Sequence, residues 1–139
     1  MKRLSTLLLT LLFVGTCAVA ANGPINKKHL PKQAQTFIRD YWPNVEIIDA
    51  ERDNGLYKVE MDDGTVLRFD NRGEWRSITN QYGFPTHYLP DGISEFIHSQ
   101  YPSSYIARVI HNAKGYIVIL NSGLELQYDN GGHIQRVAD

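Results

Sequence analysis

The chain has 139 residues, with 14 lysine and arginine residues against 15 aspartate and glutamate residues, and a formal net charge of −1. The sequence contains no cluster of basic residues that could neutralise phosphates, which argues against nucleic acid as a partner. The length suits one compact domain and is too short for two conventional ones.

Residues 1–20 have the pattern of a secretory signal peptide. Lys2 and Arg3 precede an apolar run over 7–14, and residues 18–20 (Ala-Val-Ala) form a cleavage site. One alternative is a retained membrane anchor, but the apolar run is shorter than the roughly 20 residues that span a bilayer. Another is lipidation at Cys17, for which Thr16 is a poor preceding residue. We therefore expect a periplasmic or secreted protein with no integral membrane span after cleavage.

Cleavage after Ala20 would leave 119 residues and remove Cys17, the only cysteine. Without a disulfide, the hydrophobic core would have to stabilise the mature protein alone. We expect residues 21–29 to be a flexible lead-in.

Residues 30–78 match residues 89–137 without a gap, at an offset of 59 residues, the distance from Leu30 to Leu89. The shared positions are those that a core and its turns require. Identical pairs include Leu30/Leu89, Pro31/Pro90, Phe37/Phe96, Ile38/Ile97, Pro43/Pro102, Tyr57/Tyr116, Val59/Val118, Gly64/Gly123, Asp70/Asp129 and Gly73/Gly132. Two copies predict a pseudo-symmetric pair. We place repeat 1 at 30–79, a linker at 80–88 and repeat 2 at 89–139.

Each repeat begins with a predicted helix. Apolar residues recur at helical spacing at 34, 37, 38 and 41, and again at 93, 96, 97 and 101, after a proline suited to a first turn. Pro43 and Pro102 should end the two helices near Tyr41 and Gln100, because proline disfavours helical geometry in the residue before it.

After each helix the pattern changes to the two-residue alternation of half-buried strands. We expect strands near 45–53, 56–62, 65–70 and 74–79, and near 105–112, 115–121, 124–129 and 133–138. Clusters of Asp, Asn and Gly between them predict tight antiparallel turns. Each repeat is thus predicted to be a helix followed by a four-stranded meander, an α+β fold in which the helix covers one face of the sheet.

The same Asp, Asn and Gly clusters lack the ligand spacing of a calcium loop, and the five histidines form no zinc motif. We predict no metal and no other cofactor. The sequence has no G-x-S-x-G motif, the mature chain has no thiol, and its paired carboxylates lie at turns. We therefore expect a protein that is not an enzyme.

Strand 115–120 differs from its counterpart in repeat 1, because Ile117 and Ile119 replace Lys58 and Glu60. The strand is apolar on both faces, which indicates burial on both sides or an adhesive outer face. In one interpretation the two isoleucines lie at the junction of the repeats, beneath the linker aromatics Tyr82, Phe84 and Tyr88.

In the other interpretation they belong to a partner-binding patch on the open sheet face, since residues of the same parity share a side. Its candidate residues are Lys58, Glu60, Val66, Arg68, Ile117, Ile119, Glu125 and Gln127. Trp75 could extend the patch, but the equivalent Ile134 indicates a core position.

The run L-P-x5-F-I-x3-[WY]-P-x3-I, followed by Y-x-V-x-[ML]-x-x-G and [FY]-D-N-x-G, resembles the PepSY-like family of exported bacterial proteins, described as beta-lactamase-inhibitor-like. The resemblance covers the whole mature chain in two tandem copies. It implies one long curved sheet with helices on one face, a periplasmic or outer-surface setting, and relatives in Bacteroidetes. Related domains restrain peptidases, and the beta-lactamase inhibitory protein grips its enzyme with a concave sheet face. The shared motif positions assign an inhibitory role to no residue.

We expect an exported, non-enzymatic domain that binds an unidentified protein, such as a peptidase or other hydrolase, through the open sheet face. A sheet presents pre-organised side chains, which lowers the entropic cost of binding. One alternative is a small-molecule or peptide binder of the cell envelope, with a pocket between the repeats near Tyr82 and Phe84. Another is a structural component of the envelope.

Overall fold

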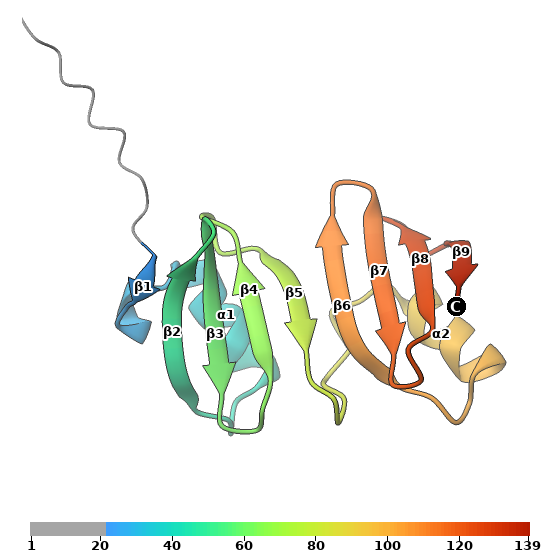
Figure 1. The fold of residues 1–139 in the computed structure, drawn as a ribbon, viewed down its shortest axis with the longest axis horizontal. Coiled ribbons are helices and arrows are strands. Elements are labelled where there is room, and N and C mark those ends of the chain that lie inside the picture. Colours follow the sequence, from blue (N-terminus) through green and yellow to red (C-terminus); the bar gives the residue numbers. More distant parts are fainter. Residues whose placement is uncertain (1–21) are drawn as a thin grey trace, which may run out of the picture.

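The computed structural model describes residues 22–139, which form one antiparallel sheet with two helices behind it (Figure 1). The helices are α1 (Lys32–Tyr41) and α2 (Asp91–Gln100), and a short 3-10 helix, η1, covers Lys27–His29. The strands are β1 (Gly23–Pro24), β2 (Ile47–Asp53), β3 (Leu56–Met61), β4 (Val66–Phe69), β5 (Trp75–Thr79), β6 (Ile106–Asn112), β7 (Gly115–Leu120), β8 (Glu125–Asp129) and β9 (Ile134–Ala138). They lie in the sheet in chain order. The predicted signal peptide and Cys17 lie outside the described residues.

The two helices begin and end as the prolines predict. Pro31 and Pro90 each immediately precede the first helical residue, and α1 and α2 end at Tyr41 and Gln100. The residue after each helix donates one last backbone N–H, from Trp42 to the Ile38 carbonyl and from Tyr101 to the Ile97 carbonyl. The proline that follows prevents the helix from extending further.

The 59-residue offset relates the elements as it relates the sequence. Strands β2 to β5 follow α1, and strands β6 to β9 follow α2. Helix α2 and strands β6 to β9 each begin 59 residues after the equivalent element of repeat 1. The predicted α+β class is confirmed. The sheet is a single open layer of nine described strands.

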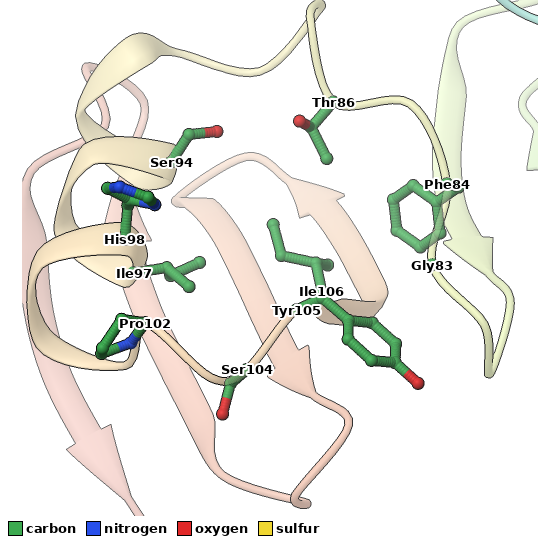
Figure 2. Close-up of a pocket in the computed structure, with 10 residues that line it drawn as sticks. All are labelled: Gly83, Phe84, Thr86, Ser94, Ile97, His98, Pro102, Ser104, Tyr105 and Ile106. Carbon is green, nitrogen blue, oxygen red and sulfur yellow. The ribbon is translucent and has the colours of Figure 1, made fainter.

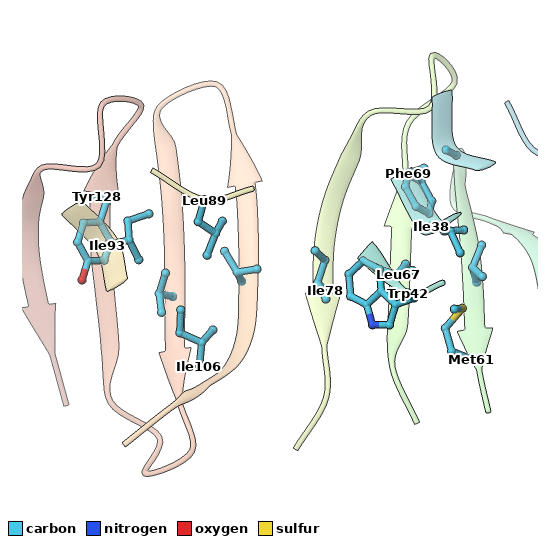
Figure 3. Close-up of a cluster of buried hydrophobic side chains, with 14 of the residues drawn as sticks. Ile38, Trp42, Met61, Leu67, Phe69, Ile78, Leu89, Ile93, Ile106 and Tyr128 are labelled. Atoms are coloured by element: carbon cyan, nitrogen blue, oxygen red, sulfur yellow. The ribbon is translucent and has the colours of Figure 1, made fainter. Parts of the chain in front are cut away.

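The core lies between the sheet and the helices. Val59, Leu67 and Ile78 face α1 from successive strands, and Val118 and Leu126 take the corresponding positions in repeat 2. Figure 3 shows buried side chains of both repeats along the sheet, including those of Phe69 and Tyr128. Burying aliphatic and aromatic groups contributes about 1.5 to 3 kcal/mol for each side chain, so this layer supplies the main stabilisation.

Strands β5 and β6 join the repeats. Ser77 pairs with Ile110, Ile78 with Val109, and Thr79 with Arg108. The buried Asn80 then fixes the start of the linker, because its side-chain amide donates to Thr65 Oγ1 at 2.9 Å and its Oδ1 accepts from the Tyr82 backbone N–H at 2.9 Å. The linker leaves the sheet at a defined point.

Of residues 21–29, expected to be a flexible lead-in, the described part, residues 22–29, instead contains β1 and η1. Gly23 and Pro24 pair with Arg52 and Glu51 of β2, and the Ile25 N–H donates to the Ala50 carbonyl at 2.9 Å. Two-residue strands carry almost no periodic signal, so the alternation test could not detect this one.

Candidate functional site

The face of the sheet opposite the helices carries two rows of side chains that run across both repeats. Residues directly opposite each other on neighbouring strands point to the same side of a sheet, so the pairing register defines each row. The first row is Glu51, Lys58, Arg68, Ser77, Ile110, Ile117, Gln127 and Arg136, and the second is Asp49, Glu60, Val66, Thr79, Arg108, Ile119, Glu125 and Ala138. We call these two rows the open face.

All eight residues predicted for the patch lie on the open face. Lys58 is opposite Arg68 and Glu60 is opposite Val66, while Ile117 is opposite Gln127 and Ile119 is opposite Glu125. Their placement follows from the two-residue alternation on strands β3, β4, β7 and β8.

The central residues of the open face come from β5 and β6, which the sequence-based patch omitted. Ser77 and Ile110, with Thr79 and Arg108 beside them, connect the predicted residues of repeat 1 to those of repeat 2. Alternation within each strand could have placed them on this side, but the pairing of β5 with β6 occurs once and has no counterpart in the repeat pattern. That pairing makes two half-patches into one surface.

The centre of the open face is apolar and its repeat 1 flank is charged. Ile110, Ile117 and Ile119 are half-buried on neighbouring strands β6 and β7. On the flank, Lys58 Nζ lies 3.2 Å from Glu60 Oε1 and 3.5 Å from Glu51 Oε1. The hydrogen bond to Glu60, with further attraction from Glu51, outweighs desolvation and raises the pKa of Lys58. The flank is therefore a network of ion pairs held in place on the strands.

Two further polar contacts order the same face. Arg68 Nη2 lies 3.9 Å from Asp53 Oδ2, and the Gln127 amide donates to Glu125 Oε2 at 3.1 Å. The Ser77 hydroxyl, between Arg68 and Ile110 in the first row, is buried and lacks a hydrogen-bond partner within residues 22–139. An unpaired buried hydroxyl costs free energy, so the middle of the face retains unused hydrogen-bonding capacity.

The interpretation that the linker aromatics cover Ile117 and Ile119 is wrong. Tyr88 lies on the helix side, with its ring centroid 4.8 Å from that of Tyr41, and Phe84 lines a cavity beside α2. Tyr82 is 80% exposed, whereas a ring packed over the isoleucines would be buried. The linker returns to the helix layer to begin α2, which carries its aromatic side chains away from the open face.

Trp75 belongs to the helix side, as the equivalence with Ile134 indicated. Its ring centroid lies 5.6 Å from that of Tyr88, 5.2 Å from that of His111 and 6.4 Å from that of Phe37. These rings fill the space between the two repeats behind β5 and β6. Burial raises the pKa of Tyr88, and a smaller effect comes from nearby Tyr41.

A cavity of about 270 Å³ lies beside α2 (Figure 2). Its lining residues are Gly83, Phe84, Thr86, Ser94, Ile97, His98, Pro102, Ser104, Tyr105 and Ile106. It contains Phe84 of the predicted small-molecule pocket but not Tyr82. The cavity belongs to repeat 2 and the linker, and α1 contributes no residue to it.

A second cavity of about 400 Å³ takes the equivalent place in repeat 1. Subtracting 59 from the lining positions 94, 97, 98, 102, 104, 105 and 106 gives residues 35, 38, 39, 43, 45, 46 and 47, and all of these line the second cavity. A hollow that recurs at the same place in both repeats follows from how each helix C-terminus meets the first strand.

The aspartates of the predicted turns hold their own loops. Asp70 Oδ1 accepts from the backbone N–H groups of Arg72 and Glu74 at 2.9 and 3.0 Å, and Asp129 Oδ1 accepts from those of Gly131 and His133 at 2.9 Å each. This is the conformational role expected for Asp in tight turns. Within residues 22–139 no three His, Cys, Asp or Glu side chains converge to form a metal site.

The fold and the open face define a sheet-based class of small α+β proteins, and comparison with known families identifies it. Residues 19–70 and 55–136 match the family described as "Putative beta-lactamase-inhibitor-like, PepSY-like". The chain therefore belongs to the PepSY-like family, in two tandem copies. Comparison with curated proteins finds no match.

Solved structures from Bacteroides share the fold. A "putative periplasmic protein of unknown function" from Bacteroides vulgatus is 25% identical over 86% of this chain and 100% of its own, with a TM-score of 0.79. A second Bacteroides vulgatus periplasmic protein is 25% identical over 87% of this chain and 99% of its own, with a TM-score of 0.78. A protein described as "putative calcium-regulated periplasmic", from Bacteroides thetaiotaomicron, is 22% identical over 85% and 97%, with a TM-score of 0.80.

These neighbours support the predicted periplasmic location. In residues 22–139 the structure has no helix with the length and apolar character needed to cross a membrane.

Proposed function

We propose that this protein binds another envelope protein through the open face and does no chemistry of its own. The observation that carries the proposal is the continuous two-row surface, with half-buried isoleucines at its centre and ordered ion pairs on its flank. An apolar centre within a polar rim is the usual anatomy of a protein interface.

The rigidity of the sheet supports protein binding. The open-face side chains stand on strands that are hydrogen-bonded on both sides from β2 to β8, so little conformational entropy is lost when a partner docks. Lys58 and Glu60 already hold each other at 3.2 Å, which spares the partner the cost of ordering them. We further propose that the unit of this surface is a helix plus a four-stranded meander, duplicated in tandem.

The family description suggests the kind of partner. The description likens the family to an inhibitor of an enzyme, so we propose that the partner is a peptidase or other hydrolase of the envelope and that docking blocks it. Support for the hydrolase rests on the family, whereas support for protein binding rests on the open face itself.

The small-molecule alternative has less support. Of the two equivalent cavities, the one beside α2, at about 270 Å³, falls below the roughly 300 to 1,000 Å³ of typical ligand pockets, while the one in repeat 1, at about 400 Å³, lies within that range but away from the linker aromatics. The recurrence of the α2 cavity in repeat 1 indicates that unit packing produces it. The two equivalent cavities differ in the polar side chains that line them, so they share a shape and not a binding chemistry.

The proposal is tested by affinity capture from the native periplasm with the wild-type protein and with the Arg68→Ala, Ile119→Ala double variant. The matched control is Phe84→Ala, Tyr105→Ala, which alters the cavity and leaves the open face intact. We expect one protein to be retained by the wild type and the control and lost with the double variant. Equal retention by all three proteins would contradict the open-face model, and loss only in the control would favour the cavity.

A further inference from the structure

The last strand of each repeat has a different neighbour. Strands β5 and β9 are equivalent by the 59-residue offset, and each pairs on its inner side with the preceding strand. On its outer side β5 pairs with β6, whereas β9 pairs with no strand of residues 22–139. The outer edge of β5 is thus covered by β6, and the equivalent edge of β9 is uncovered within residues 22–139.

The exposed fractions of two equivalent side chains show the effect of the strand that β5 has beside it and β9 lacks. Ile78 of β5 and Val137 of β9 both face the helix side, opposite Leu67 and Leu126. Ile78 is 0% exposed, with the fully buried Val109 of β6 opposite it, while Val137 is 45% exposed. A strand added beside β9 would bury Val137 as β6 buries Ile78.

The β9 edge lacks three of the features that proteins use to block strand addition, and its one β-bulge recurs in β5, which still pairs with β6. The three features are proline, inward-pointing charge and a covering segment. At the opposite edge of the sheet, β1 covers part of β2 and includes Pro24. Residues 134–138 contain no proline, and their single charged side chain, Arg136, lies on the open face. Ile134 and Val137 expose apolar surface on the helix side.

We propose that β9 accepts an extended segment of a partner protein as a tenth, antiparallel strand. The β5–β6 register predicts which residue types that segment carries opposite β9. Positions equivalent to Ser77, Ile78 and Thr79 are Arg136, Val137 and Ala138, so the residue opposite Val137 is a β-branched aliphatic, as Val109 is opposite Ile78. The residue opposite Arg136 is acidic, because oppositely charged cross-strand pairs are favourable.

A second copy of this chain is a poorer occupant. The strand equivalent to β6 is β2, and a head-to-tail copy would have to offer the outer edge of β2. That edge is engaged, since β1 pairs with Glu51 and Arg52 and the Ile25 N–H donates to Ala50. A copy would need to displace β1 first.

The test uses a labelled peptide of residues 105–112 that carries Glu in place of Ile110, so that its acidic residue faces Arg136 and its Val109 faces Val137. We expect saturable binding by fluorescence anisotropy, with slowed amide exchange in β9. Arg136→Glu should weaken binding at least tenfold, and a peptide with Lys at position 110 should restore it to that variant. Arg72→Glu, at an exposed arginine of the turn between β4 and β5 and away from β9, is the matched control and should leave binding unchanged.

Strand addition requires the peptide backbone, so the same peptide N-methylated at alternate residues should not bind. Equal binding of the methylated peptide, absence of saturable binding by the unmethylated one, or no reversal by the charge swap would each overturn the proposal. A β9–β9 dimer seen by sedimentation, which the peptide does not dissociate, would also overturn it.

Discussion

Ile78 of β5 and Val109 of β6 lie opposite each other at the join between the repeats, and both side chains are fully buried. This pair is where one repeat's core meets the next repeat's sheet. It makes the two copies one structural unit and brings the two halves of the open face into register.

Replacing Ile78 with alanine should lower the free energy of unfolding by about 2 to 5 kcal/mol, the usual cost of such a truncation in a core. The equivalent Val137→Ala should cost less than about 1 kcal/mol, because that side chain is 45% exposed and has less contact to lose. Urea unfolding of both variants checks this. Equal losses would show that the two positions have similar surroundings.

Gly73 should be intolerant of a side chain for a steric reason. Its φ is +88°, and a Cβ there would lie 2.8 Å from the Ala34 backbone N and 2.9 Å from Pro31 Cβ, at the start of α1. Gly64 has nearly the same φ, +89°, with nothing within 4 Å of an added Cβ. Gly64→Ala should therefore cost about 1 to 2 kcal/mol for the backbone alone, and Gly73→Ala about 1 to 3 kcal/mol more. Similar unfolding midpoints for the two variants would contradict the contact with α1.

Neighbouring residues on β7 test which face is covered. Val118 is fully buried against the helix side and Ile119 is half-buried on the open face. Val118→Ala should cost about 2 kcal/mol of unfolding free energy, and Ile119→Ala clearly less although it removes more carbon atoms. A greater loss for Ile119→Ala, measured by thermal or urea unfolding, would mean that the open face is covered in the isolated protein.

The acid side of the stability profile should depend on Asp70. Burial opposes ionisation, but hydrogen bonds from the Glu74 and Arg72 backbone N–H groups, with the Arg76 guanidinium at 2.8 Å, hold the pKa of Asp70 below its ordinary value of 3.8. Since the folded-state pKa is the lower one, this stabilisation is complete well above pH 3.8 and is lost as the pH falls through the folded-state pKa. Asp70→Asn should flatten the loss of stability below about pH 5. Urea titrations between pH 3 and pH 6 measure the slope, and an unchanged slope would contradict the assignment.

The amino-acid pattern predicted the helices and strands that occur in both repeats. It missed two features that occur once, the pairing of β5 with β6 and the course of the linker. Alternation placed Lys58, Arg68 and Ile119 on one side of the sheet because side-chain parity is a local property. The pairing of Ser77 with Ile110 is a long-range contact between strands that the repeat does not duplicate. The course of the linker was also not readable from local signals, since an aromatic run carries no information about which face it will pack against.

Photo-crosslinking in living cells tests the protein-binding role of the open face most directly. A benzophenone amino acid replaces Ile119 on the open face in one variant and Ser94 beside the α2 cavity in another. We predict a crosslink to a second protein from position 119 and none from position 94. Crosslinking to a protein from position 94 alone, or from neither position while the wild-type protein still captures a partner, would contradict the proposed function.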